Sequence, residues 1–201
     1  MKRYWIKDSL SPYFMTHTVV DWMNVFVNAG LNGIILDLFS YYRYKYEIEI
    51  FAYVIMPNHL HYIACFNQEK YGLSQFVRDF KAQISKKLYQ RLRLMKNETS
   101  FPVDNIFSEN NLKINNPKFL IRHFEKEGNR NNQQFKLWRD DECPVILGYE
   151  EMAIQRLNYL HENPVRKGWV TKPENYIYSS ARYYENGDIF PFRVTHLIKN
   201  E

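Results

Sequence analysis

The sequence predicts an α+β fold with a ferredoxin-like core, in which a mainly antiparallel sheet carries helices on one face. Two apolar segments joined by the turn signal Pro57-Asn58 form a hairpin, which makes part of the sheet antiparallel. Segments with helical spacing separate this hairpin from an earlier strand and from later short strands. The chain has 201 residues, 45% hydrophobic and 24% charged, which is typical of one folded domain. We therefore expect a single domain over residues 1–201.

The first part of the chain alternates between strand-like and helix-like segments. Tyr13–Val20 is rich in aromatic and β-branched residues, which is typical of a strand. Leu31–Arg43 places apolar residues on one stripe and predicts a helix. Glu47–Met56 begins with strict alternation and becomes wholly apolar, as in a central strand. After the turn at Pro57-Asn58, His59–Phe66 returns as the second strand of the hairpin.

The longest helical signal covers Leu73–Met95, where apolar residues recur every three or four positions. Between Lys70 and Lys96 the sequence has eight lysines and arginines and a single acidic residue, Asp79. The net charge of this element exceeds the +5 of the whole chain, whose pI is near 9.0. A charged helix face is often merely solvated, but such faces usually mix both signs. The single sign here favours contact with phosphates.

The second part of the chain begins with an irregular region. Asn97–Gln134 is rich in asparagine and predicts an inserted lobe or a system of mobile loops rather than a second domain. The tail, at about 165–201, is rich in turn residues. The regular elements that we expect here are a helix at Pro117–Lys126, short strands at Phe135–Arg139 and Val145–Leu147, and a helix at Glu150–Glu162 that ends at Asn163-Pro164.

Composition excludes membrane, secreted mini-domain and disordered proteins. The apolar runs, such as Gly33–Phe39, are too short to cross a bilayer. The first residues carry positive charge but no apolar segment or cleavage site of a secretory signal. Cys65 and Cys143 are too few for a disulfide framework. We therefore expect a reduced, cytoplasmic protein.

The aromatic content points to a class of partner. Aromatic residues make up 17% of the chain, which also carries an excess of positive charge. Unpaired bases stack on aromatic rings while phosphates meet lysine and arginine, so this combination suits nucleic acid. A core that is simply rich in rings would give the same composition, and composition alone leaves both interpretations open.

The first candidate for chemistry is the pair His59 and His61. Residues two apart in a strand project from the same face, so both imidazoles point toward one spot. Pro57-Asn58 places that spot at the end of a strand, and two ligands would leave positions open for oxygens, as a catalytic ion needs. Histidines in strands are more often hydrogen-bonded packing residues, and an isolated pair of this kind does not decide between the two. His17, among aromatic neighbours in the first strand, is expected to be a packed neutral histidine.

The second candidate is Tyr159 in the expected helix Glu150–Glu162. At 100° per residue it lies opposite the apolar stripe of that helix. Gln155 and Asn163 are each one turn away on the same face, so a phenol and carboxamides are displayed together. The alternative is a surface tyrosine beside a helix-stopping asparagine, and with 16 tyrosines in the chain spacing alone cannot choose this one.

These motifs together resemble a known family. The sequence is similar to the single-tyrosine HUH transposases, and most closely to the branch of REP-associated tyrosine transposases. The resemblance runs in order over most of the chain from about Tyr13 to Tyr184, whereas Asn97–Gln134 has no match. It is carried by MPNHLH (Met56–His61), YLHENPVRKGWV (Tyr159–Val170) and PENYIYSSARYY (Pro173–Tyr184), and also by YFMTHTVVDW (Tyr13–Trp22) and FKLWRDDECPVIL (Phe135–Leu147).

The resemblance implies a ferredoxin-like fold and cleavage of single-stranded DNA through a covalent 5′-phosphotyrosine. It makes His59 and His61 the metal ligands and Tyr159 the nucleophile. Asn163 takes the place where relatives supply a further polar ligand. The implied physiological ion is magnesium. Two imidazoles suit manganese or other transition metals better, so we expect magnesium or manganese. No other small-molecule cofactor is implied.

The implied substrate is a single strand that folds into a small hairpin. Among relatives the active site is completed either within one subunit or by a partner's tyrosine, so a homodimer is possible. Basic residues of the expected long helix, with two near Tyr159, would track the DNA backbone. These candidate DNA-binding residues are Arg78, Lys81, Lys86, Lys87, Arg91, Arg166 and Lys167.

Three functions are compatible with these residues. The first is a transposase that cleaves and rejoins DNA. The second is a domesticated DNA- or RNA-hairpin-binding protein that has lost turnover, against which the intact set of His59, His61, Tyr159 and Asn163 argues. The third is a metal phosphodiesterase that uses water, with Tyr159 as a bystander.

Overall fold

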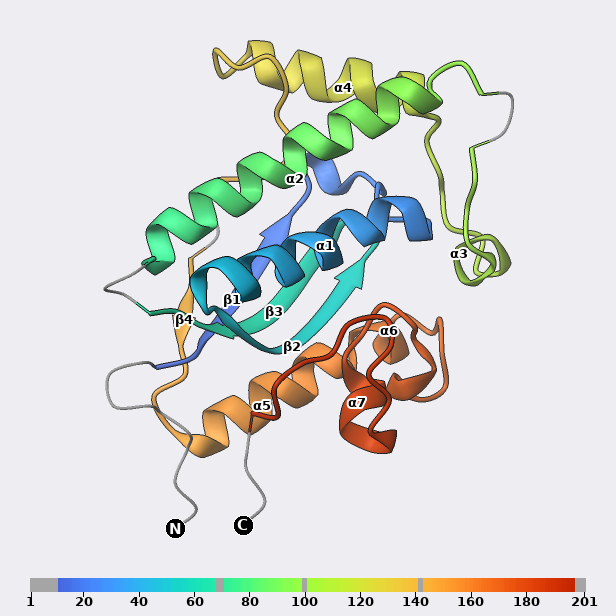
Figure 1. Ribbon diagram of the computed structural model, residues 1–201. Coiled ribbons are helices and arrows are strands. Elements are labelled where there is room, and N and C mark those ends of the chain that lie inside the picture. Colours follow the sequence, from blue (N-terminus) through green and yellow to red (C-terminus); the bar gives the residue numbers. More distant parts are fainter. Residues whose placement is uncertain (1–10, 68–70, 99–100, 141–142, 198–201) are drawn as a thin grey trace.

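The computed structural model describes residues 11–67, 71–98, 101–140 and 143–197. Its centre is an antiparallel sheet in the order β2-β3-β1-β4 (Figure 1). The strands are β1 (Tyr13–Thr18), β2 (Glu49–Met56), β3 (His59–Cys65) and β4 (Val145–Ile146). The helices are α1 (Ala29–Tyr46), α2 (Leu73–Met95), α3 (Asn105–Glu109), α4 (Pro117–Asn129), α5 (Glu150–His161), α6 (Asn163–Arg166) and α7 (Ala181–Asn186), with short 3-10 turns η1 (Val20–Trp22) and η2 (Pro173–Asn175).

The order of elements confirms the predicted α+β fold. Along the chain, β1, α1, β2, β3, α2 and β4 follow one another, and β1 pairs with both β3 and β4. This is the connectivity and strand order of a ferredoxin-like sheet. Among the described residues, no helix is both long and apolar enough to cross a membrane.

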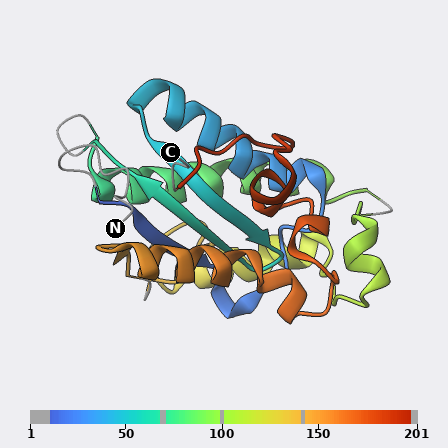
Figure 2. The ribbon, with the colours of Figure 1, turned by 90° about the horizontal axis from the view of Figure 1, so that it is seen from below.

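Helices cover both faces of the sheet, so the prediction of helices on one face holds only for the core. Tyr62 of β3 packs its ring against Phe39 of α1 and Phe80 of α2. Its neighbour His61 points to the opposite face, where its ring meets Tyr159 of α5. Figure 2 shows α5 and α1 on opposite sides of the strands. The reason is that β3 is buried along its whole length, so side chains on both of its faces need a cover.

The outer edge of β2 is covered by the tail of the chain. The amide of Ile55 donates to the carbonyl of Tyr178, and the amide of Ser180 donates to the carbonyl of Tyr53. The Tyr176 hydroxyl donates to the carbonyl of Ile55 as well. These bonds tie part of the turn-rich tail, which follows α5 and α6, to the edge of the sheet.

Some predicted strands differ from those in the structure. The first strand ends at Thr18, because the chain turns away at η1 after Val19. The predicted strand at Phe135–Arg139 is wrong: this segment makes only a bridge between Trp138 and Val19. The segment Phe135–Arg139 runs beside the end of β1. Because the chain turns at η1 directly after Val19, no extended backbone remains there with which a longer strand could pair.

The asparagine-rich region contains α3 and α4, and α4 packs along α2. The predicted helix at Pro117–Lys126 is confirmed and runs on to Asn129. Asn116 caps it by accepting from the amide of Phe119. Within this region α4 is thus a helical cover on α2, whereas α3 packs Phe107 against Trp169 and Tyr178 of the tail.

Two glycine-to-alanine changes should shift stability in opposite directions. At Gly128 an added Cβ would lie 2.6 Å from the carbonyl oxygen of Gln133, so Gly128→Ala should destabilise the fold by roughly 1–3 kcal/mol. Gly33 lies inside α1 with open space around it, so Gly33→Ala should stabilise by about 0.5–1 kcal/mol. Urea unfolding of both variants measures this, and equal effects of one sign would contradict it.

Candidate functional site

His59 and His61 lie side by side on one face of β3, directly after the hairpin turn. Their ring centroids are 4.8 Å apart. Both are buried, with 7% of His59 and 6% of His61 exposed. The prediction that the two imidazoles share one spot is confirmed by this geometry, which follows from the two-residue repeat of a strand.

The orientation of both rings is fixed through their Nδ1 atoms. Nδ1 of His59 is 2.7 Å from Oδ1 of Asn58, and Nδ1 of His61 is 2.8 Å from Oγ1 of Thr16. Burial lowers the pKa of His61 well below its ordinary value, and the nearby His59 lowers it further, so this imidazole is neutral at neutral pH. Neutral imidazoles held at Nδ1 present Nε2, which is how histidine commonly binds a metal. The donor chemistry of the pair fits a divalent ion.

Tyr159 of α5 lies against the histidine pair in the same chain. Its ring centroid is 5.6 Å from that of His61 and 6.1 Å from that of Phe14, both in edge-to-face geometry. The side chain is 41% exposed, so one part of the ring packs on the sheet while solvent reaches the rest. The structure therefore brings together two imidazoles and a phenol from segments about a hundred residues apart, without a second subunit.

Arg166 is the charged neighbour of Tyr159. Its guanidinium carbon is 4.5 Å from the centre of the Tyr159 ring, and its Nη2 donates to the Tyr159 carbonyl at 2.8 Å. This contact arises because α6 follows α5 after a single residue, which folds Arg166 back on the end of α5. A positive charge beside the phenol would favour an arriving phosphate.

Asn163 is buried at the junction of α5 and α6. Its Nδ2 donates to the carbonyls of Tyr159, at 3.0 Å, and Leu160, at 3.4 Å. These bonds satisfy carbonyls at the end of α5 and fix the position of the Tyr159 backbone. With Nδ2 committed to the helix, Oδ1 is the atom that could serve as a metal donor. Within the described ranges, no group of three or more histidine, cysteine, aspartate or glutamate side chains is placed to hold a metal.

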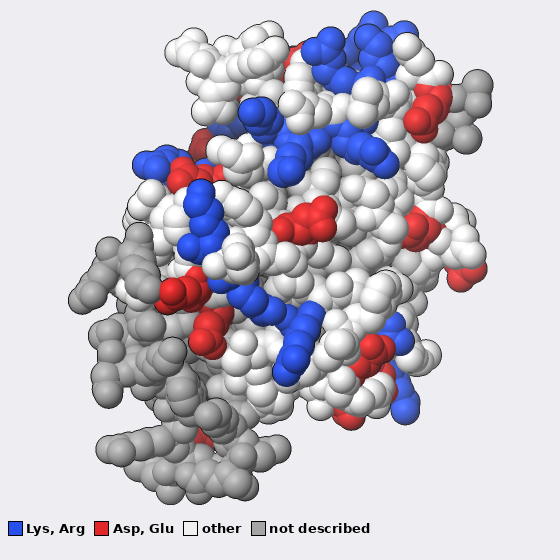
Figure 3. Space-filling model, in the orientation of Figure 1, with Lys and Arg blue, Asp and Glu red and all other residues white. Residues whose placement is uncertain are grey.

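The candidate DNA-binding residues fall into two groups. Arg166 lies against Tyr159 and Lys167 follows it in the chain, whereas the residues of α2 lie on the opposite face of the sheet. Figure 3 shows lysine and arginine gathered over α2 and α4. Arg78 is paired with Asp79 at 2.9 Å, and the Lys81 ammonium donates to the carbonyl of Arg139. Lys86, Lys87 and Arg91 are exposed.

His17 occupies the other face of β1, away from His61. Its Nε2 is 2.9 Å from the hydroxyl of Tyr62, and its ring packs on Phe80 and Trp138. The expectation of a packed histidine is confirmed. Sequence reasoning missed Trp22, whose ring lies 5.9 Å from that of His59. No pattern in the sequence distinguishes Trp22, because its position depends on the turn η1 that follows β1.

Comparison with known proteins agrees with this geometry. Residues 17–107 match the family model described as "Transposase IS200 like". This match supports the resemblance seen in the sequence motifs over residues 17–107. The IS200-like segment includes both histidines, while Tyr159 and Asn163 lie beyond it. No curated protein matches the sequence.

Two solved structures are similar to the chain. A REP-associated tyrosine transposase bound to a REP hairpin is 16% identical with a TM-score of 0.53, covering 100% of this chain and 93% of that one. A putative transposase from Deinococcus radiodurans R1 is 16% identical with a TM-score of 0.42, covering 81% of this chain and 97% of that one. At this identity, the first likeness shows a shared fold, the fold expected for the REP-associated branch.

The Thr16 hydroxyl should matter for metal binding although it would not touch the ion. Thr16→Val removes the partner of His61 Nδ1 and keeps the shape of the side chain, so affinity for Mn²⁺ should fall by about 10–100-fold. Thr195→Val, at an exposed position in the tail, is the matched control and should bind as the wild type does. Titration calorimetry with Mn²⁺ checks this, and unchanged affinity in Thr16→Val would count against a metal site here.

Proposed function

We propose that this protein is a metal-dependent transposase and endonuclease that cleaves and rejoins hairpin-bearing single-stranded DNA through a covalent 5′-phosphotyrosine. The observation that carries the proposal is the contact of Tyr159 with His61 beside His59, all within one chain. The IS200-like match over the histidine hairpin supports the same reaction class. The hairpin substrate is suggested by the related structure, which is bound to a REP hairpin.

His59, His61 and Asn163 would hold Mg²⁺ or Mn²⁺. When bound, such an ion supplies positive charge that polarises a phosphodiester and stabilises charge developing during attack. The residues of the chain supply the rest: Asn58 and Thr16 orient the imidazoles, and Asn163 fixes the backbone of Tyr159. Arg166 places a second positive charge at the phenol.

Tyr159 would act as the nucleophile. Its oxygen forms a bond to phosphorus as the bond to the 3′ oxygen breaks; the phenol gives up its proton and the leaving 3′ oxygen takes one up. The product is a 5′-phosphotyrosine and a free 3′-hydroxyl. Attack by a 3′-hydroxyl of a second strand reverses the step and joins the strands, so no external energy source is needed. Tyrosine normally has a pKa near 10, which is why a neighbouring positive charge is useful here.

The nucleophile is tested by comparing two exposed tyrosines of the same helix region. Tyr159→Phe should abolish the covalent adduct with a labelled hairpin-bearing DNA strand in the presence of Mn²⁺, while Tyr149→Phe should leave it intact. Tyr149 is 59% exposed and directly precedes α5. A denaturing gel shows the adduct as a slower band, and chelation of the metal should remove it.

The same gel distinguishes the proposed transposase from the two alternative functions, a phosphodiesterase and a hairpin-binding protein. Cleavage that survives in Tyr159→Phe without an adduct would indicate a phosphodiesterase that uses water. Binding without any cleavage by the wild type would indicate a hairpin-binding protein. Either result would overturn the proposed transposase.

The basic residues of α2 are proposed to contact the DNA backbone on the far side of the sheet from Tyr159. Replacing Lys86, Lys87 and Arg91 together by alanine should weaken binding of single-stranded DNA at low salt. If each contacts one phosphate, the slope of log K against log salt should become shallower by about 0.7 for each residue replaced. Fluorescence anisotropy at several salt concentrations measures the slope, and an unchanged slope would exclude α2 from the interface.

A further inference from the structure

The turn η1 holds a tryptophan in an unusual position. Asp21 and Trp22 have φ values of 50° and 54°, in the left-handed region that residues other than glycine rarely adopt. The Trp22 side chain is 53% exposed, although it is the largest apolar side chain available to a core. Conformations of this kind persist where the surrounding structure determines them, and they cluster at binding and catalytic sites.

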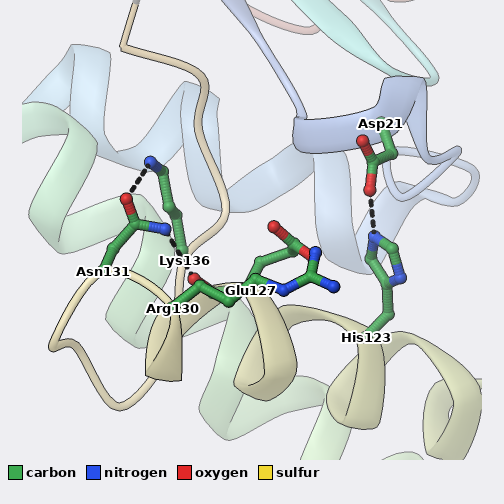
Figure 4. Close-up of polar contacts among 6 residues, drawn as sticks. All are labelled: Asp21, His123, Glu127, Arg130, Asn131 and Lys136. Atoms are coloured by element: carbon green, nitrogen blue, oxygen red, sulfur yellow. Dashed lines mark hydrogen bonds and ion pairs between the residues drawn. The ribbon is translucent and has the colours of Figure 1, made fainter.

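Contacts within the turn and from two other segments fix its position. The amide of Trp22 donates to the carbonyl of Val19 at 3.0 Å, and Nδ2 of Asn58 donates to the Trp22 carbonyl at 3.3 Å. Oδ2 of Asp21 lies 3.0 Å from Nε2 of His123 in α4, the contact drawn in Figure 4. Asn58 also holds Nδ1 of His59, so one side chain positions both the turn and the first histidine.

The exposed indole is the first of a series of ring contacts that ends at Tyr159. Trp22 meets His59 edge to face at 5.9 Å, His59 meets His61 at 4.8 Å, and His61 meets Tyr159 at 5.6 Å. Arg139 places its guanidinium carbon 5.8 Å from the centre of the Trp22 ring. A nucleotide needs this combination of a flat apolar surface and a positive charge, because its base stacks and its phosphate is anionic.

We propose that Trp22 is the stacking residue for an unpaired base of the DNA strand, next to the phosphate that lies over His59 and His61. The inference rests on the proposed function, because it takes the histidine pair as the site of the scissile phosphate. Arg139 supplies positive charge to the same nucleotide. The inserted lobe contributes through His123, which contacts Asp21 in the turn that presents the indole.

The binding test uses two oligomers of equal charge. One is a fluorescent oligothymidine of about 12 nucleotides, since stacking tolerates any base, and the other is an abasic strand of the same length. Trp22→Ala should weaken binding of the oligothymidine by about 5- to 150-fold, the equivalent of one stacked base, and leave binding of the abasic strand unchanged. Trp22→Phe should retain most of the affinity, because a phenyl ring can still stack.

The matched control is Tyr44→Ala. Tyr44 is 92% exposed on α1, on the face of the sheet opposite the histidine pair, so its removal should change neither affinity. Thermal unfolding verifies that the variants fold. Equal binding of oligothymidine by Trp22→Ala and the wild type would overturn the inference. So would an equal loss on both strands, or no binding of oligothymidine by the wild type.

The inference and the proposed function can fail separately. The adduct at Tyr159 is measured on a denaturing gel, independently of affinity. A base-dependent loss in Trp22→Ala without any adduct in the wild type would leave a single-strand binding site at Trp22 and refute the cleavage reaction. An adduct in the wild type without a base-dependent loss in Trp22→Ala would support the transposase and refute the stacking role.

Discussion

The packing of α5 on the sheet face that carries His59 and His61 is the interaction on which the candidate site depends. Without it the two imidazoles would lie at an open sheet surface, and Tyr159 would be one of many exposed tyrosines. The edge-to-face contacts of Tyr159 with Phe14 and His61 place the phenol at the histidines. The bonds from Asn163 to the end of α5 then hold that helix end in place.

Burial gives the histidine pair its character. Both rings are almost fully covered, and a buried imidazole is costly unless its polar atoms have partners. Asn58 and Thr16 provide those partners at Nδ1, which orients the rings as well as satisfying them. The same burial keeps His61 neutral, the form in which an imidazole coordinates a metal.

Charge is distributed over both sides of the sheet. Arg166 stands at Tyr159, where a scissile phosphate would be held, whereas the exposed cations of α2 face away from the histidine pair. A DNA substrate that touched both would have to pass around the edge of the sheet, which is easier for a flexible single strand than for a stiff duplex. The inserted lobe packs on α2 and reaches η1 through His123, so it connects the two regions.

The sequence by itself determined the order of the strands and helices of the core from β1 to α2, the hairpin with two histidines on one face, and the long basic helix. Each follows from local rules: a two-residue repeat, a three-to-four-residue repeat and a turn at Pro57-Asn58. Phe135–Arg139 showed the limit of such rules, because its strand-like composition does not say whether a partner strand continues beside it. Only the tertiary structure decided that α5 covers the second face, that Tyr159 reaches His61 within its own chain, and that Trp22 stands exposed beside His59. These depend on contacts between residues far apart in the chain, which no local periodicity encodes.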